Sequence, residues 1–283
     1  MTFNSEKFRN KIRRLILTTC IVLSVCVLTA CGKDAKKERE LREQAIGFMQ
    51  QGDFSAAVAR FDEALSYHDG KPGKVEIDIL RYRAEAEILA GDYANAANTY
   101  AQLRREDGDR PEYINLEIIC MLRSGQSPRK ALELYNHSCE TDPHGTGNLE
   151  ALYALGTALS HTGKEEDIRT AQQLYETALA DETSASGELY NRIGSIVFEQ
   201  DDVESAVDWF NKGIEFIQHH PEMNEQDVLA SLKYNIAVCY EYRHDYKTAE
   251  ALFNEYAQQY GSSEAIEHEL DFLESRTRET ETQ

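Results

Sequence analysis

Residues 234–256 read YNIAVCYEYRHDYKTAEALFNEY, and this stretch decides the fold. Its first half places Tyr234, Ile236 and Tyr240 on an apolar helical face, with the small residue Ala237 near the middle. Its second half opens with a turn tripeptide and continues with residues at a helical spacing: Ala249, Phe253 and Tyr256. The stretch predicts two helices joined by a short turn.

The same order of residues recurs along the chain. Three more copies open with similar tripeptides, each followed by a small residue and then an aromatic one: Gly52-Asp53-Phe54, Gly91-Asp92-Tyr93 and Asp201-Asp202-Val203. Two further copies, after Gly125 and Gly163, contain one and three extra residues. Prolines, which a helix interior excludes, fall between copies at Pro111, Pro143 and Pro221.

These copies resemble the tetratricopeptide repeat (TPR), a helix–turn–helix unit of about 34 residues. The resemblance covers residues 38–261 as six units and implies an all-α fold, an α-solenoid of about six repeats. We expect successive units to stack, because no single pair of helices buries its apolar face alone. The third unit departs from the pattern, since Ile118 and Ile119 stand where the others have a small residue. This departure puts the packing geometry of that unit in doubt.

Small residues predict how the two helices of a unit approach each other. We expect Ala57 and Ala64 to face Ala45, with the aromatic residue of each unit filling the gap to the next one. A stack of repeats needs a soluble end. We therefore expect a capping helix over residues 262–275, with Ile266, Leu270 and Leu273 as its apolar face, and a disordered tail over residues 276–283.

The first thirty residues have the features of a secretion signal. A basic segment precedes an uncharged, mostly apolar stretch from Leu15 to Ala30, which is short for a membrane span. The stretch ends in Leu28-Thr29-Ala30-Cys31, which resembles a bacterial lipobox. The resemblance implies cleavage between Ala30 and Cys31, a diacylglycerol on Cys31, and residues 31–37 as a tether. The alternative is an uncleaved anchor helix in which Cys31 is an ordinary cysteine.

The chain is strongly acidic, with 30 Lys and Arg, 50 Asp and Glu, and a net charge of −20. Loss of residues 1–30 removes five basic residues and one acidic residue, which changes the net charge to −24. Such a body repels phosphate backbones, so we expect no nucleic-acid binding, and it favours a basic partner. Five basic residues follow the lipobox and suit either an anionic lipid surface or a solvated helix start: Lys33, Lys36, Lys37, Arg39 and Arg42.

No pattern of catalytic or cofactor-binding residues stands out. The sequence contains no phosphate-binding G-x-x-x-x-G-K-[ST] loop, no H-E-x-x-H helix and no G-x-S-x-G elbow. We therefore predict no enzyme activity, no cofactor and no metal. The densest set of potential metal ligands lies around one turn between repeats: His137, Cys139, Asp142 and His144. Cys120, Cys139 and Cys239 are expected to be buried free thiols, and a Cys120–Cys139 bridge is the alternative.

The resemblance also implies a binding surface. In TPR proteins the first helices of the repeats line a concave groove that often binds a peptide. By register, the resemblance places five residues toward that groove: Arg42, Met49, Tyr153, Asn191 and Tyr234. The alternative is that these side chains pack between repeats or simply face water. The set of Lys and Asn residues with which some TPR domains bind a terminal carboxylate is not reproduced here.

These observations favour a lipid-anchored, extracytoplasmic scaffold that binds a protein or peptide in the assembly or maintenance of a bacterial cell envelope. Its expected location is the bacterial cell membrane, or the outer membrane if the cell has two. A competing hypothesis is an envelope carbohydrate-binding factor or hydrolase-like enzyme that uses acidic turn residues such as Glu165-Glu166 or Asp201-Asp202. A third is association of the chain with itself through uncapped repeat surfaces.

Overall fold

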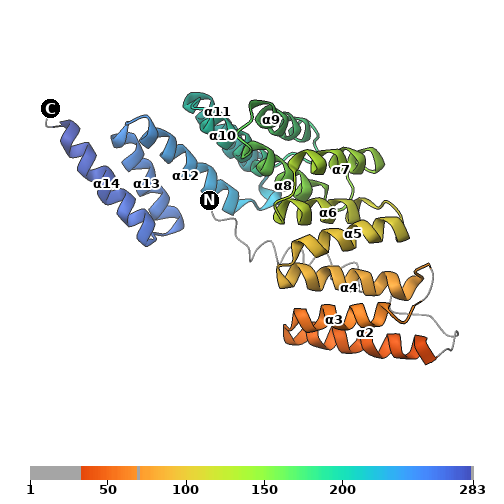
Figure 1. The fold of residues 1–283 in the computed structure, drawn as a ribbon. Coiled ribbons are helices and arrows are strands. Elements are labelled where there is room, and N and C mark those ends of the chain that lie inside the picture. The colour runs from red at the N-terminus through yellow and green to blue at the C-terminus, as the bar shows by residue number, and fades with distance from the viewer. Residues whose placement is uncertain (1–32, 69–70, 282–283) are drawn as a thin grey trace. The chain divides into compact units, whose positions relative to one another are not determined.

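The computed structural model describes residues 33–68 and 71–281, so the lipobox with Ala30 and Cys31 lies outside the described residues. The described chain forms thirteen α-helices and one short 3₁₀ helix, and it contains no strand (Figure 1). It divides into two compact units after Leu155, inside α8. We call these the N-terminal unit and the C-terminal unit.

The helices of the N-terminal unit, up to and including the one that crosses the division, are α2 (Lys33–Gln51), α3 (Phe54–Leu65), α4 (Lys74–Ala90), α5 (Tyr93–Asp107), α6 (Pro111–Arg123), α7 (Pro128–Thr141) and α8 (Asn148–Ser160). The C-terminal unit continues with α9 (Glu165–Leu179), α10 (Gly187–Glu199), α11 (Val203–His219), the 3₁₀ helix η2 (Pro221–Met223), α12 (Gln226–Tyr242), α13 (Tyr246–Tyr260) and α14 (Glu264–Glu281).

The order of helices confirms the predicted fold class. Helices α2 to α13 form six consecutive pairs, and α14 follows as a single final helix (Figure 1). Within each unit, helices that are neighbours in sequence pack on one another, from α2 to α7 and from α9 to α14. First helices of adjacent pairs also touch, as α2 does α4 and α10 does α12. This is the arrangement of an α-solenoid of six helix–turn–helix repeats with a capping helix.

Four of the turns inside pairs are built in the same way. In the first pair, Gly52 has a φ of 82°, which ends α2 in the left-handed region that favours glycine. Asp53 then accepts a hydrogen bond of 3.1 Å from the backbone N–H of Ala56 and so caps α3. The same cap recurs before α5, α11 and α13, at Asp92, Asp202 and Asp245.

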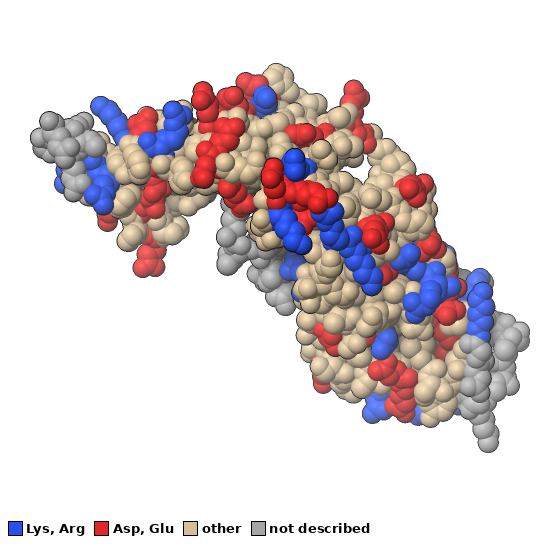
Figure 2. Space-filling model, turned by 45° about the horizontal axis from the view of Figure 1, so that its top comes forward, with Lys and Arg blue, Asp and Glu red and all other residues tan. Residues whose placement is uncertain are grey.

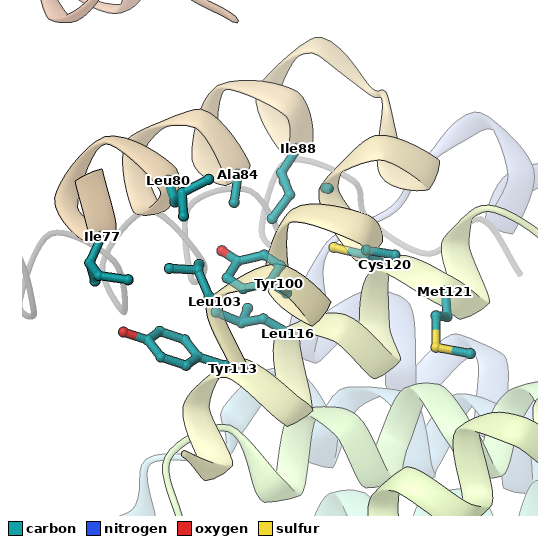
Figure 3. Close-up of a cluster of buried hydrophobic side chains, with 12 residues drawn as sticks. Ile77, Leu80, Ala84, Ile88, Tyr100, Leu103, Tyr113, Leu116, Cys120 and Met121 are labelled. Atoms are coloured by element: carbon teal, nitrogen blue, oxygen red, sulfur yellow. The ribbon is translucent and has the colours of Figure 1, made fainter. Parts of the chain in front are cut away.

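The core of the N-terminal unit begins with the first pair and confirms its predicted packing. Ala45, Ala57 and Ala64 are fully buried in one cluster, together with the ring of Phe61. The next cluster joins α4, α5 and α6, where the ring of Tyr100 lies among side chains of all three helices (Figure 3). Each second helix therefore packs against the first helices on both sides of it.

A substitution in α3 tests this close approach. We expect Ala57→Leu to lower the free energy of unfolding by about 1–3 kcal/mol, because the added methylenes overpack a site with no exposed surface. Ala59→Leu is the matched control, since Ala59 is exposed on the same helix and should change stability by less than about 0.5 kcal/mol. Thermal unfolding of both variants measures the difference, and equal effects would contradict the packing described here.

In the third pair, two large side chains stand where the first helices of the other pairs have a small residue. Ile118 and Ile119 are both buried, and α6 buries every residue from Tyr113 to Met121. A helix that is surrounded in this way needs no small residue at its centre. The departure of this repeat from the pattern therefore leaves its helical pairing intact.

The C-terminal unit uses glycine where two helices meet. A Cβ on Gly156 would lie 2.2 Å from the Tyr175 ring, and one on Gly194 would lie 2.5 Å from the Phe210 ring. Tyr175 and Phe210 are themselves buried. An aromatic side chain of the second helix therefore rests directly on the backbone of the first helix of its pair.

Both ends of the described chain differ from the predicted boundaries. Helix α2 begins at Lys33, so the prediction of a tether over residues 31–37 is wrong for its described part. The prediction of a disordered tail over residues 276–283 is wrong for residues 276–281, because α14 continues to Glu281. The guanidinium of Arg276 lies 5.2 Å from the centroid of the Phe272 ring, and Arg278 pairs with Glu274 one turn back. These local contacts extend a helix that lacks an apolar face there.

The capping role of α14 follows from its buried side chains. Ile266 and Leu273 are buried against α13, and Leu270 packs at the edge of the same cluster. Of the helices that the structure describes, none combines the length and the apolar character that a membrane span requires.

The three cysteines of the described chain are free, as predicted. Cys120 and Cys239 are buried, whereas Cys139 is only half-buried. Burial raises the pKa of the Cys239 thiol to about 11, which keeps it protonated and unreactive at neutral pH.

Candidate interaction site

In the N-terminal unit, the predicted groove residue Arg42 is engaged with the next repeat. Its Nε donates a hydrogen bond of 2.7 Å to Asp78 Oδ2 on α4, and its guanidinium lies 5.3 Å from the centroid of the Tyr82 ring. Met49 packs against the buried cluster of the first pair. Arg42 therefore lies at the meeting of two first helices, whereas Met49 contributes to the core.

A polar network that the sequence did not reveal ties three helices of the N-terminal unit together. Arg81 on α4 donates a hydrogen bond of 2.6 Å to the hydroxyl of Tyr113, at the start of α6. The same hydroxyl donates to Asp107 Oδ2 over 2.6 Å, and Arg81 also pairs with this carboxylate at 3.0 Å. Burial and the Asp107 carboxylate raise the pKa of Tyr113, so the hydroxyl stays protonated and remains a donor.

In the C-terminal unit, first helices α10 and α12 meet through two amides. Asn235 Nδ2 donates a hydrogen bond of 2.8 Å to Asn191 Oδ1. Tyr234, the neighbour of Asn235, is 36% exposed, and its ring meets the Phe253 ring edge-on at 5.4 Å between centroids. Of the two predicted groove residues in this unit, Asn191 therefore contacts the adjacent first helix, whereas the Tyr234 ring packs against α13 of its own pair.

Two aromatic side chains extend this contact along the same helices. Phe198 and Tyr242 pack edge-to-face with centroids 5.2 Å apart, and the Tyr242 hydroxyl donates to Asp201 Oδ1 over 2.6 Å. Each follows one of the paired asparagines by seven residues, which places it two helical turns along the same face. We call the four residues Asn191, Phe198, Asn235 and Tyr242 the α10–α12 stripe.

Sequence reasoning missed the aromatic half of the stripe. The available signal was the seven-residue spacing from Asn191 to Phe198 and from Asn235 to Tyr242. Tyr242 is 53% exposed, so a large aromatic side chain is held in place yet open to solvent. Tyr153, the remaining predicted residue, is half-buried on the part of α8 that belongs to the N-terminal unit.

The two units differ in charge. From Lys33 to Leu155 the sequence has 16 Lys and Arg and 22 Asp and Glu, a net charge of −6. From Gly156 to Gln283 it has 9 and 27, a net charge of −18. Figure 2 shows acidic and basic side chains interspersed on the face that it draws. The α10–α12 stripe therefore lies on the unit that carries most of the negative charge.

The acidic turn residues have local partners. Asp202 Oδ1 accepts a hydrogen bond of 3.1 Å from the Ser205 backbone and caps α11, while Asp201 accepts from Tyr242. Glu165 lies 3.7 Å from Arg169, one turn along α9. These carboxylates take part in caps and pairs of the repeats themselves.

The potential ligands near residue 140 do not converge. His137 Nε2 lies 3.1 Å from Asp109 Oδ2, and Asp142 accepts a hydrogen bond from the His144 backbone. Among the described residues, only one group presents three ligand atoms to a single point, and it lies elsewhere, at Glu38, His68 and Glu76.

Comparisons with known proteins agree with this geometry. Residues 42–111 and 153–220 match the sequence profile of a family described as tetratricopeptide repeat. These two segments match tetratricopeptide repeats, and the described chain has the α-solenoid fold that such repeats build. Repeats of this kind typically form non-catalytic scaffolds for interaction between proteins.

Solved structures show the same fold at low sequence identity. The C-terminal part of a TPR repeat-containing protein from Cytophaga hutchinsonii is 15% identical, with a TM-score of 0.58, over 93% of this chain and 96% of that one. A TPR protein from Parabacteroides merdae is 16% identical, with a TM-score of 0.52, over 84% and 99%. MamA from Desulfovibrio magneticus is 18% identical, with a TM-score of 0.50, over 67% and 98%. A search of curated protein sequences finds no match.

Proposed function

We propose that this chain is a lipid-anchored, extracytoplasmic scaffold that binds a basic protein or peptide at a bacterial cell envelope through the α10–α12 stripe. The observation that carries the proposal is the exposed, pre-packed Tyr242 on a unit of net charge −18. The envelope location rests on the lipobox-like residues Leu28 to Cys31.

The stripe has the chemistry of a protein-binding surface. Tyrosine is enriched at the centres of interfaces, and a ring already held by a neighbour loses little conformational freedom on binding. Phe198 and the Asp201 carboxylate hold Tyr242 in this way. Asn191 is half-buried and Asn235 is buried, so the asparagine pair fixes the two helices beside the exposed tyrosine.

The anchor would hold the repeats close to the membrane. Helix α2 begins at Lys33, two residues after Cys31, so at most about 7 Å of extended chain separates them. Lys36 is largely exposed near this end of the helix. Basic side chains near an anionic lipid surface add about 1 kcal/mol each to membrane attachment.

Site-specific crosslinking in cells tests the proposal. A photoreactive phenylalanine analogue replaces Tyr242 in the lipidated chain, and the same analogue replaces Tyr67 in a control. Tyr67 is also an exposed tyrosine, at 38%, but lies in the N-terminal unit. We expect one envelope protein to crosslink at position 242 and not at 67, and to do so less in a Cys31→Ala chain. Equal crosslinking at both positions would contradict the assignment of the stripe.

The charge of the C-terminal unit predicts strong salt dependence. We expect affinity for the captured partner to fall by about 10-fold or more between 50 and 500 mM NaCl, because salt screens attraction between exposed charges beyond a few ångströms. Binding curves at the two salt concentrations give the ratio directly. Affinity that does not change with salt would exclude a basic partner. The crosslinking result would still decide whether the stripe binds a protein.

A further inference from the structure

Three side chains from separate segments converge near the start of α4. Glu38 comes from α2, His68 follows α3, and Glu76 lies in the first turn of α4. Each offers one ligand atom, and the three atoms lie within 4.8 Å of one another. Glu38 and Glu76 are 5% and 6% exposed, while the His68 side chain is 28% exposed. The two carboxylates are therefore buried, and the imidazole is the most exposed of the three side chains.

Within this cluster one carboxylate oxygen lacks a partner. Glu38 Oε1 is buried and forms no hydrogen bond with the described residues. A buried acceptor that is left unsatisfied destabilises a fold unless some group occupies the position next to it. The site therefore combines two crowded carboxyl groups with an open acceptor.

The other two side chains are oriented by bonds on their far sides. His68 Nε2 lies 3.1 Å from the carbonyl oxygen of Lys71, so it carries a proton and donates it there. Nδ1 then faces Glu76 Oε1 at 2.9 Å. Glu76 Oε2 accepts a hydrogen bond of 2.7 Å from the Gly73 backbone, which leaves Oε1 turned toward the cluster. Metal-binding histidines and carboxylates are typically held by such outer bonds.

We propose that Glu38, His68 and Glu76 bind one divalent transition-metal ion, with Zn²⁺ as the best fit. One imidazole nitrogen and two carboxylate oxygens are ligands that Zn²⁺ accepts at about 2.0–2.2 Å. Ligand atoms around a four-coordinate ion at that distance lie about 3.3 Å apart, so small side-chain rotations from the present separations suffice. The imidazole disfavours Mg²⁺ and Ca²⁺, which prefer oxygen ligands alone.

Binding exchanges protons for the metal. A metal ion binds an unprotonated imidazole nitrogen and ionised carboxylates, so any proton held at His68 Nδ1 or on the two carboxyl groups leaves to solvent. Water fills the fourth position at the solvent-exposed edge. The bound ion would join α2 to α4 and so fix the first repeat to the second within the N-terminal unit.

Calorimetric titration of ZnCl₂ into the full-length chain, purified in detergent and stripped with chelator, tests the site. We expect one Zn²⁺ per chain, with affinity reduced about 100-fold or more in Glu38→Gln and in His68→Gln. Loss of an outer-shell partner alone typically reduces metal affinity 10–100-fold, and loss of a ligand should exceed that. His137→Gln is the matched control, because His137 forms a similar pair with Asp109 that lacks a third ligand. This control should bind Zn²⁺ as the unaltered chain does.

Two further measurements separate a lost site from a lost fold. Far-ultraviolet circular dichroism of the metal-free variants should match that of the unaltered chain, since both substitutions keep a polar side chain of similar size. Co²⁺ substituted for Zn²⁺ should give visible absorption bands that disappear in His68→Gln. Absence of a stoichiometric Zn²⁺ site, or equal loss in His137→Gln and His68→Gln, would overturn the proposal.

Discussion

Replacing Phe210 with alanine should lower the free energy of unfolding of the C-terminal unit by about 3–5 kcal/mol. The Phe210 side chain is 1% exposed and rests on Gly194, where even a Cβ atom would lie 2.5 Å from the ring. Because Gly194 has no side chain, this residue cannot fill the space that the ring leaves. The cavity term therefore adds to the lost burial of the ring.

The chain contains a natural fluorescent probe in the C-terminal unit. Its single tryptophan, Trp209, lies on α11 beside Phe210, so urea unfolding followed by fluorescence measures the C-terminal unit directly. Met223→Ala is the control, since Met223 is 42% exposed and its loss should change stability by less than about 0.5 kcal/mol. A loss below about 1 kcal/mol in Phe210→Ala would show that the unit relaxes around the cavity.

Replacing Arg83 with methionine should lower the free energy of unfolding of the N-terminal unit by about 3 kcal/mol at pH 8. Arg83 Nη2 lies 3.4 Å from Glu87 Oε1, and Glu87 is only 1% exposed. Without the guanidinium, Glu87 keeps one hydrogen bond, which it accepts from the Thr99 hydroxyl over 2.7 Å. The expected loss lies at the lower end of the range for broken buried pairs because the Arg83 side chain is 22% exposed.

The loss in Arg83→Met should depend on pH. Burial raises the pKa of Glu87 above 4.5 even with Arg83 in place, and removal of a positive neighbour raises it further. A carboxyl whose pKa is higher in the folded state stabilises the fold fully below its unfolded pKa, and this contribution is lost as the pH rises through the folded pKa. The difference in stability between the variant and the unaltered chain should therefore be smallest below about pH 4.5 and largest at pH 8.

A second substitution shows whether the stability loss comes from an unpaired buried charge or from lost packing. Arg83→Met combined with Glu87→Gln keeps an acceptor for Thr99 and removes the buried charge, so most of the stability should return. Hydrogen exchange of amides in α4 and α5 measures both variants within the N-terminal unit. If the double variant is no more stable than Arg83→Met, the loss arises from packing of the arginine stem.

The repeating helices could be predicted because each pair contains its own pattern of small and apolar residues. Small residues such as Ala45, Ala57 and Gly194 mark where helices approach, and they lie at regular intervals in the sequence. The ends were harder to predict. Residues 276–281 lack an apolar face, and their helix is supported by side-chain contacts one turn apart, such as Arg278 with Glu274.

The candidate sites were predictable only in part, because register along a helix is easier to infer than partners across helices. Asn191 and Tyr234 could be chosen from their positions in the repeat, whereas the pairing of Arg42 with Asp78 depends on how far α2 is offset from α4. Glu38, His68 and Glu76 lie on three separate segments, and no spacing in the sequence links them. Only the folded chain shows that their ligand atoms meet.

The turns inside the pairs have a consequence for how such a chain changes length during evolution. In the first pair, Gly52 and Asp53 bond back to the carbonyl groups of Met49 and Phe48, and Asp53 caps forward to Ala56. Every one of these bonds joins residues of the same turn. A gene segment that encodes one pair therefore also encodes every residue of the turn inside that pair. Duplication or deletion of that segment leaves the turns inside the other pairs unchanged.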